Sequence, residues 1–468
     1  MNVLKKNNMQ KHASCNDGFF GEEHRLLDNV VPQRIIGEVI QIVGLIIECR
    51  GLAVPLGSIC EVYPAQGSGV VRAEVVGFRD NCTLLMPLGE VGGISMHDRV
   101  CCVSRQQRVR VSDALLGRVL DGTGKPIDGR EPIQSGSFRE IISTPPRPMT
   151  RPRITEALGT GIKCLDGLKT CGKGQRMGIF SGSGVGKSVL MGMIARGTSA
   201  QISVIALIGE RGREVKEFIQ KDLGEEGMAR SVVVVSTSDE PALVRIRAAF
   251  LAITIAEYFR DQGNDVLFMM DSVTRLAMAL REIGLSSGEP PTTKGYPPSV
   301  FSVLPRFLER SGQAAKGSIT GFYTVLVEAD DMNEPIADAV RSIVDGHLWL
   351  SRDLAARAHY PSIAVLDSVS RLMPEVSTQQ HRHAAQKIIS LLAAYKEAED
   401  LINIGAYVKG SNPTIDTAIK YMPLINGFLR QDMQELCALE DSVKDVLRIV
   451  TEIEGAAKAP VVAKAGVK

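Results

Sequence analysis

The segment that most constrains the fold of this chain is the octapeptide SGSGVGKS, Ser181 to Ser188, which lies between a strand-like run and a helix-like run. Its alternating glycines let the backbone curl so that successive N–H groups face inward. At a helix N-terminus, where the macrodipole also favours negative charge, such a loop predicts a phosphate cradle. Lys187 is then placed to reach the β- and γ-phosphates of a nucleotide, and the Ser188 hydroxyl to ligate the Mg²⁺ that bridges them.

The alternative interpretation of the octapeptide is a glycine-rich β-to-α turn that holds no ligand. The strict phosphate-binding pattern has Gly where Ser181 stands, but a small residue still fits the turn. The strand before the loop, the helix after it and the Lys-Ser pair favour nucleotide binding. The loop residues predicted to bind ATP are Ser181, Gly182, Ser183, Gly184, Val185, Gly186, Lys187, Ser188 and Val189.

Two carboxylates follow apolar, strand-like runs downstream. Asp271 closes the run VLFMMD at the carboxyl end, where open α/β sheets bind their ligands, and is predicted to be a second Mg²⁺ anchor. Many buried strands end in Asp, so this prediction depends on the cradle upstream. Glu210 ends another strand, in IGERGREV. The pattern leaves open whether Glu210 activates a water molecule or is a carboxylate favoured by the N-terminus of the next helix.

Composition excludes several classes of protein. The 54 basic residues nearly cancel the 53 acidic ones, so nothing demands a nucleic acid or an anionic membrane as the partner. The nine cysteines include no CxxC pair and no cluster with histidine, which argues against structural zinc. No signal peptide is evident, and no run approaches the ~20 apolar residues of a membrane span. We therefore expect a cytoplasmic protein with reduced thiols.

Changes of pattern divide the 468 residues into five segments. Residues 1–30 are polar and predict a docking segment or a disordered one. Residues 31–104 carry short β-branched runs between glycines and predict a β-barrel. Residues 105–377 begin as a turn-rich connection and then alternate strands with helices, which predicts an α/β domain with a covered parallel sheet. Residues 378–454 predict a helical domain, and residues 455–468 a disordered tail.

The first helix of the predicted helical domain is amphipathic. Its apolar stripe is predicted at Ala385, Ile388, Ile389, Leu392 and Tyr395.

Eight motifs, in chain order, resemble the ATPases of type III protein export. They are SGSGVGKS, GERGREV, VLFMMDSVTRLAMALREIGL, SSGEPPTTKGYPPSVF, LPRFLERSG, VEADDMNEPIADAVRSIVDGH, HYPSIAVLDSVSRLMP and GAYVKGSNPTID. The likeness is strongest to the flagellar export ATPase, which is itself similar to the catalytic subunit of the rotary ATP synthases, and it covers about residues 30–435. It implies a RecA-like P-loop core with a parallel sheet, an N-terminal β-barrel and a C-terminal helical domain.

The resemblance assigns a role to each residue around the cradle. Lys187 and Ser188 match the phosphate-binding lysine and the magnesium hydroxyl, and Asp271 matches the second magnesium ligand. Glu210 matches the glutamate that activates water, and Arg211 matches the neighbouring arginine near the γ-phosphate. These matches imply ATP as substrate and Mg²⁺ as cofactor.

Two further roles rest on the resemblance alone. Tyr360, in HYPSI, matches an aromatic residue that packs on the adenine, and Arg371, in SVSRLMP, matches an arginine finger that enters the next subunit's site. Without the family, Tyr360 is more typical of a turn and Arg371 of a salt-bridged surface residue.

The resemblance implies a homohexameric motor, because an arginine finger acts only across an interface. Its function would be to hydrolyse Mg-ATP and assist the export of flagellar proteins through a type III secretion gate. The implied partners are export substrates and their chaperones, a central stalk-like protein, the export gate at the membrane and, at residues 1–30, a stator-like regulatory protein. The implied location is the cytoplasm, peripheral to the inner membrane at the export apparatus.

Three other functions compete with this one. A virulence-type secretion ATPase has the same chemistry, although PPTTKGY and DDMNEPIADAVRSI favour the flagellar branch. A nucleic-acid translocase of the transcription-termination type needs a basic, aromatic surface on its barrel, but residues 34–103 contain only Tyr63 and Phe78 as aromatics and no Lys. No nucleic-acid partner is therefore expected. A non-catalytic ring subunit is disfavoured by the intact Lys187 and Glu210.

Overall fold

The computed structural model describes residues 35–65, 69–327, 331 and 333–458, and the chain divides into two units between Gln107 and Arg108. The predicted docking segment, residues 1–30, lies outside the described residues, as does the tail from residue 459. Within the described part of the chain, none of the helices combines the length and apolar character that crossing a bilayer requires.

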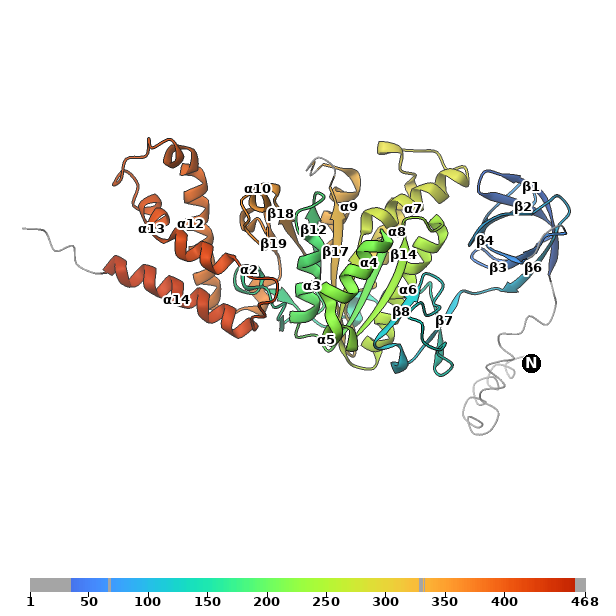
Figure 1. The fold of residues 1–468 in the computed structure, drawn as a ribbon, viewed down its shortest axis with the longest axis horizontal. Coiled ribbons are helices and arrows are strands. Elements are labelled where there is room, and N and C mark those ends of the chain that lie inside the picture. The colour runs from blue at the N-terminus through green and yellow to red at the C-terminus, as the bar shows by residue number, and fades with distance from the viewer. Residues whose placement is uncertain (1–34, 66–68, 328–330, 332, 459–468) are drawn as a thin grey trace, which may run out of the picture. The chain divides into compact units, whose positions relative to one another are not determined.

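The first unit contains a closed β-barrel, which confirms the prediction (Figure 1). Its strands pair antiparallel in the order β1-β2-β5-β4-β3-β6. Alternate side chains of the β-branched runs point inward, so that Val39, Ile47 and Val100 are fully buried. The strands are β1 (Ile36–Val43), β2 (Ile46–Arg50), β3 (Ile59–Tyr63), β4 (Val71–Arg79), β5 (Cys82–Pro87) and β6 (Arg99–Ser104).

The second unit is built on a nine-stranded sheet of order β19-β18-β12-β17-β15-β13-β14-β8, with β16 paired to β17. The strands from β18 to β8 are parallel, as the alternation of strands and helices predicts. The strands are β8 (Arg118–Asp121), β12 (Arg176–Ser181), β13 (Ile202–Glu210), β14 (Ser231–Thr237), β15 (Asp265–Asp271), β16 (Gly312–Gln313), β17 (Ser318–Leu326), β18 (Gly346–Leu350) and β19 (Val369–Ser370).

Helices cover both faces of the sheet and enclose two hydrophobic cores (Figure 1). Because side chains alternate along a strand, Ile205 packs in one core while its neighbour Val204 packs in the other. One core contains α3 and the C-terminal helices; the other contains α6, α7, α8 and α9. These helices are α3 (Lys187–Gly197), α6 (Ala242–Asp261), α7 (Val273–Ser286), α8 (Pro298–Leu308) and α9 (Pro335–Ile343).

The remaining elements are short or lie at the C-terminal end. Two small strand pairs are separate from this sheet. One joins β7 (Arg108–Val111) to β9 (Ser137–Glu140), and the other joins β10 (Ala157–Leu158) to β11 (Cys171–Gly172). The short helices are α2 (Lys163–Leu168), α4 (Gly212–Glu217), the π-helical η3 (Phe218–Leu223), α5 (Gly224–Ala229), α10 (Arg352–Ala356) and α11 (Met373–Val376). The C-terminal helices are α12 (Gln379–Asn403), α13 (Pro413–Leu429) and α14 (Leu439–Lys458).

The edge strand β8 was not predicted from the sequence. It lies in the turn-rich connection at the start of residues 105–377, where it pairs in parallel with β14 and forms the edge of the sheet. A bidentate ion pair holds it, with Arg118 Nε 2.6 Å from Asp128 Oδ2. The strand has only four residues, between a glycine and a β-turn, and this is too short a run for an alternating pattern of apolar residues to indicate a strand.

The buried stripe of α12 is wider than predicted. Ala385 and Ile388 are buried as expected, and the other three predicted residues are partly buried against the same core. The helix also buries His381, Ala384, Leu391 and Ala398, because α2, α13 and α14 all pack against it.

We expect Ile388→Ala to destabilise the protein by about 2–5 kcal/mol, because it leaves a cavity in a core shared by the sheet and the C-terminal helices. Leu401→Ala on the same helix is the control, since Leu401 is 49% exposed and its loss should cost less than about 0.5 kcal/mol. Thermal or urea unfolding measures both. Equal destabilisation by the two variants would contradict this packing.

Candidate nucleotide-binding site

The predicted cradle joins the end of β12 to the start of α3. Gly184 and Gly186 have φ values of 78° and 91°, a left-handed conformation in which glycine avoids the strain of a side chain. Gly186 is the N-cap of α3, and its carbonyl accepts the N–H of Leu190 at 3.0 Å. The N-terminus of α3 therefore opens directly onto the loop, an arrangement that binds anions.

Lys187, Glu210 and Asp271 converge beside this loop. The Lys187 ammonium contacts the Asp271 carboxylate and lies 3.5 Å from Glu210 Oε1. Their side chains are only 13%, 15% and 5% exposed, in that order. They meet because β12, β13 and β15 are parallel strands whose carboxyl ends share one edge of the sheet.

Burial and mutual charge set the protonation of this cluster. Burial lowers the pKa of Lys187, but the nearby carboxylates of Asp271 and Glu210 outweigh it, so that the pKa is raised and the ammonium stays charged. Burial, followed by repulsion from Asp271, raises the pKa of Glu210 to about 7, against the opposing effect of Lys187. A carboxylate with this pKa can take up or release a proton near neutral pH.

Tyr360 lies against the cradle from a loop far away in sequence. A Cβ built on Gly186 would lie 3.5 Å from Cε1 of the Tyr360 ring. Ser362 fastens the same loop, because its hydroxyl donates to the Val185 carbonyl at 2.6 Å. The tyrosine is 45% exposed. The structure thus brings Tyr360 to the cradle; contact with adenine remains a prediction.

The two predicted arginines are not part of the cluster. The Arg211 side chain is 83% exposed and its nearest carboxylate is that of Glu214, at 3.7 Å. Arg371 is exposed and directly follows β19. Ser370 pairs with Gly346, which pairs with Met177 near the amino end of β12, whereas the cradle follows its carboxyl end. At the usual strand rise, Met177 and Ser181 are roughly 13 Å apart.

Family models cover most of the chain. Residues 161–370 match the nucleotide-binding domain of the ATP synthase alpha/beta family, and residues 39–102 match its beta-barrel domain. Residues 377–447 match the C-terminal domain of the type III secretion ATPase EscN.

Known proteins share about half of the residues of this chain. A flagellum-specific ATP synthase of Bacillus subtilis is 55% identical over 87% of this chain and 93% of its own length. A type 3 secretion system ATPase of Xanthomonas euvesicatoria is 50% identical over 92% and 97%. This chain belongs to the family of flagellar and type III secretion ATPases. It is an ATPase of that family, as the resemblance implied.

A solved structure agrees with this assignment. The assembled ATPase EscN from the type III secretion system of enteropathogenic E. coli superposes with a TM-score of 0.84 and 46% identity, over 88% of this chain and all of that one. EscN has also been solved in complex with its central stalk EscO, with a TM-score of 0.82 to this chain. The likeness spans the barrel, the RecA-like core and the helical region.

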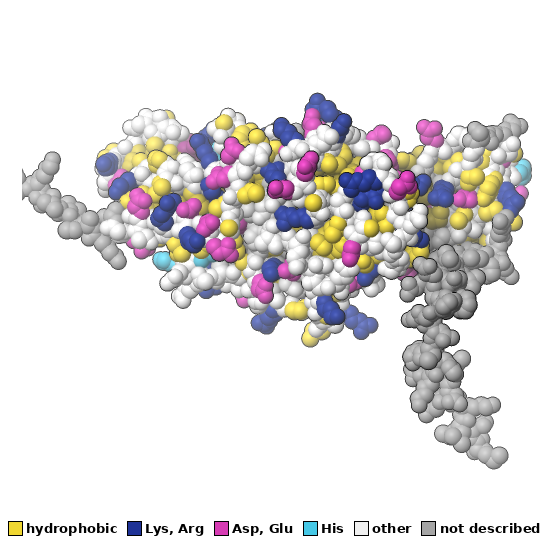
Figure 2. Space-filling view, turned by 60° about the horizontal axis from the view of Figure 1, so that its bottom comes forward, with side chains coloured by type: hydrophobic (Ala, Val, Ile, Leu, Met, Phe, Trp, Pro, Cys, Tyr) yellow, Lys and Arg dark blue, Asp and Glu magenta, His cyan; other side chains and the backbone are white. Residues whose placement is uncertain are grey.

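Basic and acidic side chains are mixed on one face of this export ATPase. Figure 2 shows Lys and Arg side chains interspersed with Asp and Glu on the described part of one face. Such a distribution differs from the continuous basic stripe of a nucleic-acid track.

Thr324 is a site residue that sequence reasoning missed. It lies on β17, between β12 and β15, and is fully buried. Its hydroxyl donates to Asp271 Oδ1 at 2.7 Å and so fixes the rotamer of that carboxylate. The run FYTVLV is typical of a buried apolar strand, and its single threonine was the only indication in the sequence of a polar contact there.

We expect Thr324→Val to lower ATP turnover by about 10- to 100-fold, since a hydrogen bond to a charged group contributes about 1.5–3 kcal/mol. Valine has nearly the same shape, so the fold should persist. Thr83→Val in the barrel is the matched control, because Thr83 is also a buried strand threonine whose hydroxyl donates to a carbonyl, that of Leu52. Steady-state hydrolysis tests the pair; parental turnover in Thr324→Val would rule out this role.

Proposed function

We propose that this ATPase works as a homohexameric motor that hydrolyses Mg-ATP to assist the export of flagellar proteins through a type III secretion gate. The observation that carries this function is the convergence of Lys187, Glu210 and Asp271 beside a glycine loop at a helix N-terminus. A charged lysine and an anion-binding loop can hold the phosphates, and a carboxylate whose pKa is about 7 can accept a proton from water. Phosphoryl transfer to water requires both.

Lys187 and Asp271 exchange partners when ATP binds, in this proposal. In the structure, the Lys187 ammonium pairs with Asp271. Phosphate oxygens entering the cradle supply a stronger anionic partner for Lys187 and release the Asp271 carboxylate. Asp271 and the Ser188 hydroxyl are oxygen donors, which fits Mg²⁺, a cation that binds one or two protein oxygens together with phosphates. Bound there, Mg²⁺ would supply charge compensation for the β- and γ-phosphates.

Glu210 is the proposed residue that activates the attacking water. It ends β13 beside Lys187 and is nearly buried, and its pKa of about 7 lies close to working pH. Arg211, next in sequence, would have to turn from its exposed position toward the γ-phosphate when ATP binds.

Arg371 is proposed to complete the site of the neighbouring subunit. In its own chain it lies at the amino ends of the strands, away from the cradle, so it serves catalysis only across an interface. A closed ring supplies that interface to every copy. The assembled form of EscN and its complex with a central stalk support a homohexamer with a stalk-like partner here.

Other partners follow from the family. We propose export substrates with their chaperones, the export gate at the membrane, and a stator-like protein that binds residues 1–30, which lie outside the described residues. The enzyme would act in the cytoplasm, peripheral to the inner membrane. A virulence-type system remains the second candidate, because relatives of both kinds are about equally similar. Loss of motility on deletion of the gene distinguishes the two.

We expect Glu210→Gln to lower ATP turnover by ~10² to 10⁴-fold while ATP still binds, because only the water-activating group is lost. Lys187→Ala should weaken ATP affinity as well as turnover, because it removes a phosphate contact. Nucleotide titration and steady-state hydrolysis separate the two effects. Near-parental hydrolysis by Glu210→Gln, or equal ATP affinity of the two variants, would refute these roles.

We also expect rings that mix Arg371→Ala subunits with Glu210→Gln subunits to regain turnover that neither variant has alone. In a random one-to-one mixture, about a quarter of the interfaces join an intact Glu210 to an intact Arg371. Native mass spectrometry checks that mixed rings form. Confirmed mixed rings without any recovered hydrolysis would contradict action across the interface.

A further inference from the structure

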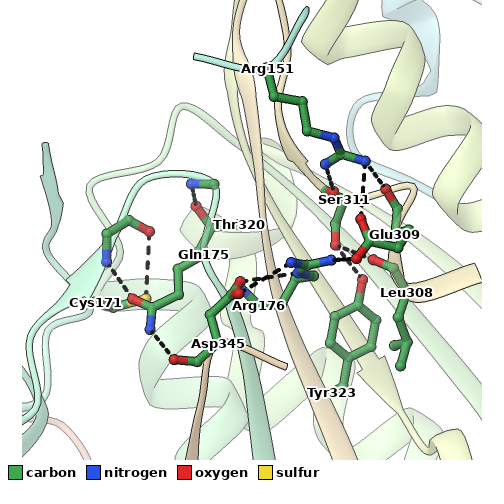
Figure 3. A network of polar contacts seen from close by, with 12 residues as sticks. Arg151, Cys171, Gln175, Arg176, Leu308, Glu309, Ser311, Thr320, Tyr323 and Asp345 are labelled. Carbon is green, nitrogen blue, oxygen red and sulfur yellow. Dashed lines mark hydrogen bonds and ion pairs between the residues drawn. The ribbon is translucent and has the colours of Figure 1, made fainter. Parts of the chain in front are cut away.

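A polar network ties β12 to the segment that carries Arg371. It lies at the amino ends of β12 and β18, whereas the cradle follows the carboxyl end of β12. Figure 3 shows three of its members, Gln175, Arg176 and Asp345. The strand β19 has only two residues and forms the edge of the sheet, and Arg371 follows it directly. A short edge strand has few ladder hydrogen bonds of its own, so side chains must supply much of what holds it.

Asp345 engages this segment through its main chain and its side chain. Its carbonyl accepts the backbone N–H of Arg371 at 3.0 Å. Its carboxylate accepts two guanidinium contacts from Arg176, Nε to Oδ2 at 3.0 Å and Nη2 to Oδ1 at 3.1 Å, together with the Arg176 backbone N–H at 3.1 Å. Its own N–H donates to the Arg176 carbonyl at 2.9 Å. Asp345, which anchors Arg371, is thus itself held to β12 by four hydrogen bonds.

Gln175 binds the residue that precedes Arg371. It is fully buried, and its Nε2 donates to Ser370 Oγ at 3.2 Å and to the Asp345 carbonyl at 3.3 Å. Its Oε1 accepts the N–H of Gly172 at 2.8 Å, which fixes the amide orientation. Ser370 Oγ in turn donates to the Thr170 carbonyl at 2.8 Å. Ser370 is therefore held from two sides.

Further ion pairs hold Arg176 in this network, and β19 packs closely against Gly346. Arg176 also contacts the Glu309 carboxylate, which lies 3.3 Å from Arg151 Nη2. A Cβ built on Gly346 would lie 2.5 Å from the Val369 carbonyl oxygen, so only glycine at this position allows β19 to approach β18 this closely. Displacement of Asp345 or of β18 would therefore move β19.

We propose that Asp345, Arg176 and Gln175 are positioning residues that fix the direction in which Arg371 projects toward the neighbouring subunit. The inference rests on the proposed function, because it requires Arg371 to act in trans. A displacement of about 1 Å in a catalytic group can lower a rate ~10²-fold. Asp345→Asn should therefore lower turnover by about 10- to 100-fold, although the variant leaves its own cradle intact and binds ATP with parental affinity.

Mixed rings distinguish this role from a purely structural one. Asp345→Asn subunits have an intact site and a misplaced finger, so mixing them with Glu210→Gln subunits should restore turnover. Mixing them with Arg371→Ala subunits should restore none, because neither subunit then offers a correctly placed finger. Subunits with a general folding defect would gain nothing from either mixture, which would overturn the proposal. Recovery with Arg371→Ala would overturn it as well.

Asp128→Asn is the matched control. Asp128 forms a similar buried bidentate pair with Arg118 and accepts the backbone N–H of Val119 at 3.2 Å, but at the opposite edge of the sheet. This variant should keep its turnover. An equal loss of turnover in Asp128→Asn would mean that any broken ion pair has this effect, and would overturn the positioning role.

Gly346→Ala provides a second variant if Asp345→Asn does not assemble. It leaves every ion pair in place but pushes β19 outward, and should give the same pattern in the two mixtures. Failure of both variants to assemble would assign the network to the fold and overturn the inference. The mixture of Arg371→Ala with Glu210→Gln is run in parallel. If it recovers turnover while Asp345→Asn follows another pattern, only the positioning role fails; if it does not, the proposed action in trans has failed.

Discussion

The contact of Lys187 with two buried carboxylates is the interaction on which the rest of the site depends. Three charged groups, none more than 15% exposed, are tolerated because each compensates another. The Lys187 ammonium opposes the rise that burial and Asp271 cause in the pKa of Glu210. The same compensation makes the site responsive to a nucleotide, because an entering phosphate would compete for the Lys187 ammonium that the two carboxylates share. Thr324 limits this rearrangement by holding Asp271 from the next strand.

The cradle and Arg371 lie at opposite ends of the strands of one parallel sheet. The cradle, Glu210 and Asp271 occupy the carboxyl ends of β12, β13 and β15, where helix N-termini and free backbone groups can bind anions. Arg371 and its supporting network occupy the amino ends. In the proposed mechanism, a monomer therefore holds both halves of a catalytic site but cannot join them. In the proposed ring, this separation makes hydrolysis depend on assembly.

Much of the fold was readable from the sequence because its signals are local. Apolar strands alternating with helices predicted the parallel sheet, and glycine-bounded β-branched runs predicted the barrel. The strand β8 was missed because four residues are too few for periodicity, and it depends on a distant pair, Arg118 with Asp128. Thr324 and Asp345 were missed for a related reason: their roles arise from contacts between strands that are far apart in sequence. The positions of Arg211 and Arg371 had to await the structure, because exposure cannot be read from a motif.

The most direct test of this account is a structure of the assembled ring with a non-hydrolysable ATP analogue and Mg²⁺. The account predicts that the Lys187 ammonium lies within about 3 Å of a phosphate oxygen and no longer contacts Asp271. It also predicts that the arginine at the γ-phosphate includes the partner subunit's Arg371. A nucleotide-bound site in which Lys187 still pairs with Asp271, or in which Arg211 of the same chain is the only arginine at the γ-phosphate, would contradict it.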